Sequence, residues 1–278
     1  MPLIRINFQK GINYLCDPDD RVTPNFPDRE AALFGIRMST CRISFEVESG
    51  DGGSQYGGGT AFFVSPTILL TASHSALKEG QTVRAQLPGT ERVEMNDEAV
   101  CKRELKKLGK TLKMRVVKAF FTGRHAQWTD LAILETTGLD CDEWVELDLE
   151  SQLEPGDKVD VVGYPGYHDR DRMLILHSEL KHNIDEAMSD ADILLPPGQL
   201  SVSFGEIIRD GKNPTYRLST TAGMSGGAVV FNGKVIGMLT VVQLLIVGVH
   251  IGSNIKGENH CTPLKPFREE LLEVLRDN

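Results

Sequence analysis

The sequence predicts an all-β protein, a barrel or sandwich, closed by one helix at the C-terminus. From Arg42 onward, short apolar runs recur with glycine and proline between them. Regularly spaced short strands with such turns are typical of β-barrels and β-sandwiches. With 278 residues, of which 40% are apolar and 25% charged, the chain can bury a sizeable core.

The predicted elements follow one another along most of the chain. Strands are expected at residues 42–48, 60–64, 67–73, 114–121, 130–135, 158–165, 199–208, 215–220, 227–231, 234–242 and 244–252. Residues 1–35 are polar and rich in turn-forming residues, which indicates an arm, and the charged residues 100–115 indicate a surface loop. From Pro263 to Leu275, leucines and a phenylalanine recur at helical spacing and predict one amphipathic helix.

Charge and hydropathy narrow the classes of partner. The chain has 39 acidic and 30 basic residues, a net charge of −9, and no compensating block of lysine or arginine. Nucleic acid and anionic membranes are therefore not expected as partners. The longest apolar run, Leu239 to Ile251, is shorter than the ~18 residues that a membrane span needs.

The N-terminus lacks the continuous apolar core of a secretory signal. We therefore expect a cytoplasmic protein by default, with secretion only by an unrecognised route. A monomer is the default expectation for its oligomeric state. The five cysteines are scattered without zinc-ligand spacing, so we expect reduced thiols and neither a metal nor a cofactor.

A glycine-rich turn around Ser225 is the sharpest local feature. In TTAGMSGGAVVF (residues 220–231), Ser225 lies between glycines and between two strand-like runs. Such glycines let the backbone bend so that the amides of Gly223 and Ser225 can face a developing oxyanion. The alternative is a glycine-rich β-turn with an incidental serine.

Two further residues complete a catalytic set. His74 follows an apolar strand in FFVSPTILLTASHSA (residues 62–76), and Asp130 opens the apolar strand in WTDLAILE (residues 128–135). A serine needs an imidazole to take its proton, and the imidazole needs a carboxylate to fix its tautomer. Taken singly, His74 would be read as a turn histidine and Asp130 as a strand cap.

The order His74, Asp130, Ser225, together with GYPG at residues 163–166, resembles the chymotrypsin-like serine peptidases over roughly residues 35–265. The resemblance implies a double six-stranded β-barrel of the trypsin-like type with the active site in the cleft between barrels. It also implies peptide or protein substrates. The units would be an arm (1–35), an N-terminal barrel (36–145), a C-terminal barrel (146–262) and a helix (263–278).

The segment LSTTAGMSGG (residues 218–227) is most similar to the glutamyl endopeptidase branch. That similarity places Ser219 at the floor of the primary specificity pocket, where no acid favours Arg or Lys. In this branch a threonine matching Thr220, a histidine and the mature N-terminal amine receive the substrate carboxylate. A buried carboxylate needs such donors. The resemblance thus implies cleavage after Glu, or less readily after Asp.

Two frames compete for the pocket histidine. KVIGML (residues 234–239) follows the serine motif directly and puts Leu239 there, which would make the pocket apolar. LIVGVHIGSN (residues 245–254) matches the family segment better and supplies His250, but it requires an insertion. We favour His250 and keep both frames open.

The arm raises a question of latency. RVTPNFPDRE (residues 21–30) resembles the start of mature glutamyl endopeptidases, so a cut after Arg21 would free the amine of Val22. Residues 1–21 would then be a pro-segment; otherwise they are an uncleaved arm. The competing function is a latent or inactive protease-fold module that binds or signals.

Overall fold

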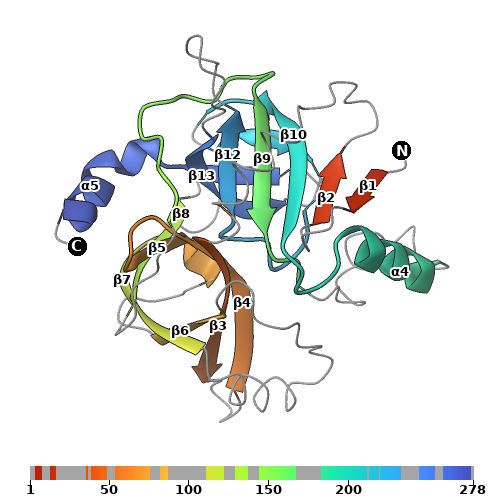
Figure 1. Ribbon diagram of the computed structural model, residues 1–278, viewed down its shortest axis with the longest axis horizontal. Coiled ribbons are helices and arrows are strands. Elements are labelled where there is room, and N and C mark those ends of the chain that lie inside the picture. Colours follow the sequence, from red (N-terminus) through yellow and green to blue (C-terminus); the bar gives the residue numbers. More distant parts are fainter. Residues whose placement is uncertain are drawn as a thin grey trace.

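In its described residues, the computed structural model has two β-sheets and the α-helices α4 and α5 (Figure 1). It describes residues 4–7, 13–16, 36, 39–48, 54–75, 82–86, 111–121, 129–136, 144–166, 183–211, 213–218, 220–232, 244–253 and 259–276. The all-β prediction with a closing helix is confirmed by this architecture.

The first sheet is a closed antiparallel barrel in the order β3-β4-β5-β8-β7-β6. Its strands are β3 (Thr40–Glu48), β4 (Ser54–Phe63), β5 (Ile68–Thr71), β6 (Thr82–Gln86), β7 (Thr111–Phe121) and β8 (Asp130–Thr136). The interior holds alternate side chains of these strands, among them Ile43, Phe63, Leu69, Met114 and Leu134. The sequence predicted each of these strands except β6, but it predicted β4 only from Thr60 onward and wrongly placed residues 111–113 of β7 in a surface loop.

The second sheet has eight strands in the order β1-β2-β10-β11-β14-β13-β12-β9, and β9 also pairs with β10. The strands are β1 (Ile4–Asn7), β2 (Asn13–Cys16), β9 (Lys158–Gly163), β10 (Ser201–Arg209), β11 (Thr215–Arg217), β12 (Ala228–Asn232), β13 (Leu244–Ser253) and β14 (Asn259–Pro263).

The eight strands differ from the expected six because a hairpin of the N-terminal arm joins this sheet. β11 pairs with β10 only from Glu206 to Arg209, so Ser201–Ser203 offer a free edge, where β2 pairs in parallel. In Figure 1 the hairpin β1–β2 lies beside β10, with α4 nearby. The predicted strand at residues 234–242 lies outside the described residues.

The two sheets share a hydrophobic core. Phe62, Leu70 and Leu131 of the first sheet pack with Val162 and Val230 of the second. The neighbouring residues of the same first-sheet strands point into the barrel instead. β5, β8 and the last residues of β4 are thus buried on both faces, which explains why these stretches are continuous apolar runs rather than alternating ones.

The C-terminal helix is confirmed as a short 3₁₀ turn, η3 (Lys265–Phe267), continued by α5 (Arg268–Arg276). Leu264 and Leu271 enter the shared core, and the Phe267 ring lies 4.9 Å from that of Phe120. The sequence analysis missed α4 (Ile184–Leu194), whose first turn carries two acids that suit a helix N-terminus. Neither α4 nor α5, the helices of the described chain, has the length and hydropathy of a membrane span.

Candidate active site

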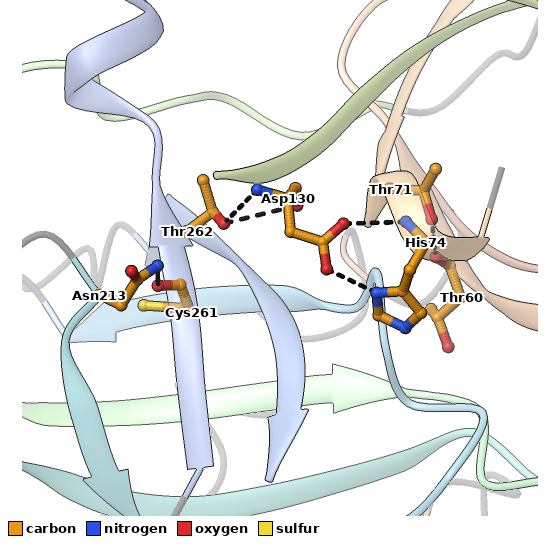
Figure 2. Close-up of polar contacts among 7 residues, drawn as sticks. All are labelled: Thr60, Thr71, His74, Asp130, Asn213, Cys261 and Thr262. Atoms are coloured by element: carbon orange, nitrogen blue, oxygen red, sulfur yellow. Dashed lines mark hydrogen bonds and ion pairs between the residues drawn. The ribbon is translucent and has the colours of Figure 1, made fainter. Parts of the chain in front are cut away.

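His74 and Asp130 meet at one end of the first barrel. His74 lies in η1 (Ser73–Ser75), directly after β5, and Asp130 is the first residue of β8, which pairs with β5. His74 Nδ1 is 2.5 Å from Asp130 Oδ2, and the His74 backbone N–H donates to Asp130 Oδ1 at 2.9 Å (Figure 2). Both carboxylate oxygens therefore hold His74, so the Nδ1 proton faces Asp130 and Nε2 keeps its lone pair.

The Asp130 and His74 side chains differ in their exposure to solvent. The Asp130 side chain is 5% exposed and the His74 side chain 40% exposed. The carboxylate is thus sheltered, whereas the imidazole is accessible. An imidazole oriented by a buried carboxylate can accept a proton at Nε2 and hold the positive charge that results.

Thr262 of β14 holds Asp130 from the second sheet. Its hydroxyl oxygen lies 3.2 Å from the Asp130 backbone N and 3.4 Å from the Asp130 backbone O (Figure 2). Thr262 is 2% exposed, so these contacts are sheltered from water. The main chain of Asp130 is therefore anchored to both halves of the molecule.

Ser225 lies in a turn between β11 and β12 in which every carbonyl from Thr221 to Ser225 accepts a hydrogen bond. In chain order, the donors are Met224 N, Gly166 N, Thr60 Oγ1, Gly227 N and Thr60 N. The distances run from 2.6 to 3.2 Å. GYPG, which the sequence analysis singled out, contributes the Gly166 amide. Hydrogen bonds to its carbonyl groups thus fix the conformation of the turn.

The amides of the same turn divide into two groups. Those of Met224, Gly226 and Gly227 donate within the protein. Those of Gly223 and Ser225 have no acceptor among the described residues. Because N–H and C=O of a trans peptide point in opposite directions, fixing the carbonyls of Ala222 and Met224 turns these two amides the other way.

Glycine is required at two positions of the turn. Gly223 and Gly226 have φ of +91° and +88°, in the left-handed region. A Cβ on Gly223 would lie 2.4 Å from Gly166 N, and one on Gly226 would lie 2.0 Å from Thr60 O. The bend predicted from the glycines is therefore also a site of close backbone packing.

The Ser225 turn lies against the segment that carries His74. A Cβ on Gly59 of β4 would be 2.8 Å from the Ser225 carbonyl oxygen and 2.6 Å from the hydroxyl oxygen of Ser75, the neighbour of His74. No hydrogen bond links Ser225 to His74 in the described part of the chain. In uncomplexed enzymes such bonds are often long and tighten only with substrate.

The structure places His250 of β13 beside the Ser225 turn and buries it completely. The Gly226 amide donates to the His250 carbonyl at 2.7 Å, and the His250 amide to that of Gly227 at 2.9 Å. Tyr216 OH donates to the His260 carbonyl at 2.9 Å, so His250 Nδ1–H donates to the Tyr216 oxygen. His250 Nε2 is buried without a partner in the described structure.

Burial, and secondarily the nearby His74, lowers the pKa of His250 to about 3. His250 is therefore neutral at physiological pH. Of the other predicted pocket residues, Ser219, Leu239 and Val22 lie outside the described residues, as does Arg21.

Thr220 is half-buried, and its hydroxyl bonds to Asn259 Oδ1 of β14. Asn259 Nδ2 in turn donates to the Leu218 carbonyl at 2.7 Å. The sequence analysis missed Asn259, as it missed β14, because NHCTP has no apolar run. The sequence carried no clear signal for this strand, because its buried residues Asn259, Cys261 and Thr262 do not form an apolar pattern.

The described residues contain no group of three or more potential metal ligands. Cys41 and Cys261 are buried and outside any disulfide, and burial raises the pKa of Cys261 to about 12. These two cysteines are structural rather than reactive.

Comparison with known proteins agrees with this geometry. The family model described as "Trypsin-like peptidase domain" matches residues 59–238, more than half of the chain. The chain belongs to the trypsin-like peptidase family. As a protease domain of this family, it has peptide or protein substrates. No curated protein matches the chain.

Solved structures show the same fold. The Rv3671c protease of M. tuberculosis in its inactive form aligns with a TM-score of 0.50 and 16% identity, covering 90% of this chain and 96% of that one. A serine-to-alanine variant of that protease, also an inactive form, aligns with a TM-score of 0.49 and 16% identity, covering 92% and 93%. At this identity the first likeness shows a trypsin-type fold and nothing finer.

Replacing Gly226 by alanine is expected to destabilise this peptidase more than replacing Gly156. Gly156 has a similar φ of +93°, but a Cβ there would meet nothing within 4 Å. Both variants lose about 1–2 kcal/mol to left-handed strain; Gly226→Ala adds about 1–3 kcal/mol of overpacking. Urea unfolding followed by tryptophan fluorescence measures the difference. Equal losses would show that the turn does not pack against Thr60 as described.

His250 is expected to make the fold acid-labile. Its pKa is about 3 in the folded state against 6.5 in the unfolded state, so the unfolded chain binds the proton first. Its stabilising contribution is complete above pH 6.5 and is lost toward pH 3, at up to about 1.4 kcal/mol per pH unit. In urea titrations from pH 7 to 4, His250→Gln should lose less stability than the parent. Parallel curves would contradict the buried neutral state.

Proposed function

We propose that this chain is a serine endopeptidase with Ser225 as nucleophile, His74 as general base and Asp130 as the group that orients His74. The amides of Gly223 and Ser225 form the oxyanion hole. One observation carries the proposal: beside an oriented His–Asp pair, the turn around the serine has all its carbonyls bonded and leaves these two amides free. The finer fold we propose is two six-stranded barrels, β3–β8 and β9–β14, with the site in the cleft between them.

The chemistry follows from the groups in place. Ser225 Oγ attacks the scissile carbonyl while His74 Nε2 takes its proton, and Asp130 stabilises the imidazolium. The carbonyl oxygen becomes an anion, which the Gly223 and Ser225 amides bind. His74 then protonates the leaving amine, and the acyl-enzyme forms. Water, deprotonated by His74, releases the acid product and restores Ser225.

A second candidate is a latent or inactive protease-fold module that binds or signals. The missing hydrogen bond between Ser225 and His74 in the described structure favours it. In the latent form, cleavage after Arg21 would bring the site into its working geometry. In the inactive form, no processing would do so.

For specificity, we propose a preference for Glu, and secondarily Asp, before the cut, with Thr220 and His250 as recognising residues. Two observations support it: the half-buried Thr220 hydroxyl donates to Asn259 Oδ1, a proton that can turn to a substrate carboxylate, and His250 Nε2 is buried without a described partner. A buried acceptor or donor without a partner is costly, so a ligand there gains a hydrogen bond.

Recognition of a carboxylate by His250 requires a proton shift. In the described arrangement Nδ1 carries the proton, so Nε2 is an acceptor and would repel a carboxylate. If the Tyr216 O–H turns from the His260 carbonyl to His250 Nδ1, the proton can reside on Nε2 and donate to the substrate. The exchange loses one hydrogen bond, about 1 kcal/mol, against a charge-assisted bond of about 1.5–3 kcal/mol. The Val22 amine, if freed, would add a third donor.

Replacement of Ser225 by alanine should abolish labelling by a fluorophosphonate probe and nearly all peptide hydrolysis. The residual rate is about 10³ to 10⁴ above water, from binding and the oxyanion hole. Labelling is read by mass spectrometry of the modified peptide. Labelling only after removal of residues 1–21 would support the latent form, and no labelling in either form would support the inactive module.

A peptide library read by mass spectrometry should show Ser225-dependent cuts after Glu. Paired substrates with Glu or Gln before the cut test the pocket, because the two side chains have the same shape and differ in charge and in the donor NH2 of Gln. Thr220→Val should lower kcat/KM for Glu by about 10-fold and leave Gln little changed, since it removes one donor to a carboxylate. Ser225-dependent cuts after apolar residues would keep the triad and favour Leu239 as the pocket residue.

A further inference from the structure

Thr60 of β4 joins the first barrel to the Ser225 turn by hydrogen bonds. It is fully buried, and all its polar groups are engaged. Its backbone N–H donates to the Ser225 carbonyl at 2.8 Å, and its carbonyl accepts from the Thr71 hydroxyl at 2.7 Å. Thr71 is the last residue of β5, two residues before η1, which carries His74 (Figure 2).

The Thr60 side chain makes two more bonds, which reach across to the second sheet. The Tyr164 backbone N–H donates to Thr60 Oγ1 at 2.8 Å, and Thr60 Oγ1 donates to the Gly223 carbonyl at 2.8 Å. A hydroxyl has a single proton, and an N–H can only donate, so the direction of both bonds is determined. Any other side chain of this size breaks at least one of them.

These bonds act on the Gly223 peptide, whose own side chain cannot orient it. Glycine gives a backbone little preference between conformations, so the direction of the Gly223 amide depends on the peptide groups that flank it. The preceding carbonyl, that of Ala222, is bound by the Gly166 amide. The following carbonyl, that of Gly223 itself, is bound by Thr60 alone among the described residues.

We propose that Thr60 is a positioning residue for the oxyanion hole: its hydroxyl fixes the Gly223–Met224 peptide, ties it to the Tyr164 backbone and so limits rotation at Gly223, which keeps the Gly223 amide facing the substrate carbonyl. This inference rests on the proposed peptidase function. Thr60 touches no reacting atom. Its effect is therefore on the transition state, where charge appears on the oxygen, and not on substrate binding.

The test compares Thr60→Val, which keeps the shape and removes the hydroxyl, with Thr60→Ser, which keeps the hydroxyl. We expect Thr60→Val to lower kcat by about 10- to 100-fold, which is no more than the decrease in kcat caused by removing an oxyanion-hole donor outright. KM should stay within about threefold of the parent value. The affinity for a peptide aldehyde, whose adduct places an anion in the hole, should fall by a similar factor. Thr60→Ser should restore both.

Thr40→Val is the matched control, because Thr40 is also a fully buried β-strand threonine, but its hydroxyl bonds locally to the Ile36 carbonyl. It should lower the melting temperature and leave kcat and aldehyde affinity unchanged. If Thr60→Val does not fold, Thr60→Cys serves instead, since a thiol is a weak donor and acceptor of similar size. It should give an intermediate loss of kcat.

The outcomes separate the inference from the function beneath it. A parent protein that shows neither fluorophosphonate labelling nor Ser225-dependent hydrolysis, before or after removal of residues 1–21, would remove the peptidase function itself. An active parent whose folded Thr60→Val or Thr60→Cys variant keeps the parental kcat and aldehyde affinity would overturn the role of Thr60 only. A rise in KM with unchanged kcat would also overturn it.

Discussion

The backbone of β4 and the turn around Ser225 approach so closely at Gly59 and Gly226 that neither position can carry a side chain. A Cβ on Gly59 would meet the Ser225 carbonyl, and a Cβ on Gly226 would meet the Thr60 carbonyl. The approach lets Thr60 bond to the turn through both its main chain and its side chain. Gly59 and Gly226 are thus needed so that the two backbone segments can touch, and Gly226 also for its left-handed conformation. The position of Ser225 relative to the first barrel depends on both glycines.

A second link between the sheets lies on the other side of His74. There Thr262 of β14 bonds to the main chain of Asp130, whose carboxylate holds His74. The proposed nucleophile Ser225 and the proposed His74–Asp130 pair come from different sheets. Their relative geometry is therefore only as rigid as the junction between the two sheets. The shared core of Phe62, Leu70 and Leu131 with Val162 and Val230 gives the junction its apolar content. Thr60 and Thr262 add directional hydrogen bonds across the junction.

Much of this fold was predictable, because buried strands and glycine turns leave local signatures. The continuous apolar runs of β5 and β8 indicated strands, and the residues at their ends, His74 and Asp130, stood out as polar groups beside apolar ones. The hairpin β1–β2 was not predictable as part of the second sheet, since its pairing depends on a short free edge of β10. β14 was hidden by its polar composition, although its buried asparagine and threonine have partners.

The site residues that the sequence did not reveal share one property. Thr60, Thr262, Tyr216 and Asn259 are polar residues whose partners are distant in sequence or belong to the backbone, so no spacing rule finds them. The residues that the sequence did reveal carry reactive groups in an order that resembles a known family. Sequence reasoning thus reached the chemical groups, whereas the groups that orient them needed the tertiary structure.

The two histidines near the site have opposite requirements, and the structure separates them. In the proposed reaction His74 becomes positively charged in each cycle, and Asp130 is placed to stabilise that charge. A second charged imidazole nearby would oppose it, and the pKa of His250 is indeed lowered by burial and by His74. His250 therefore contributes as a neutral hydrogen-bonding group, whose tautomer is set by Tyr216. Any recognition of an acidic substrate by His250 then depends on where one proton lies and not on a net positive charge, so it need not compete with the charging of His74.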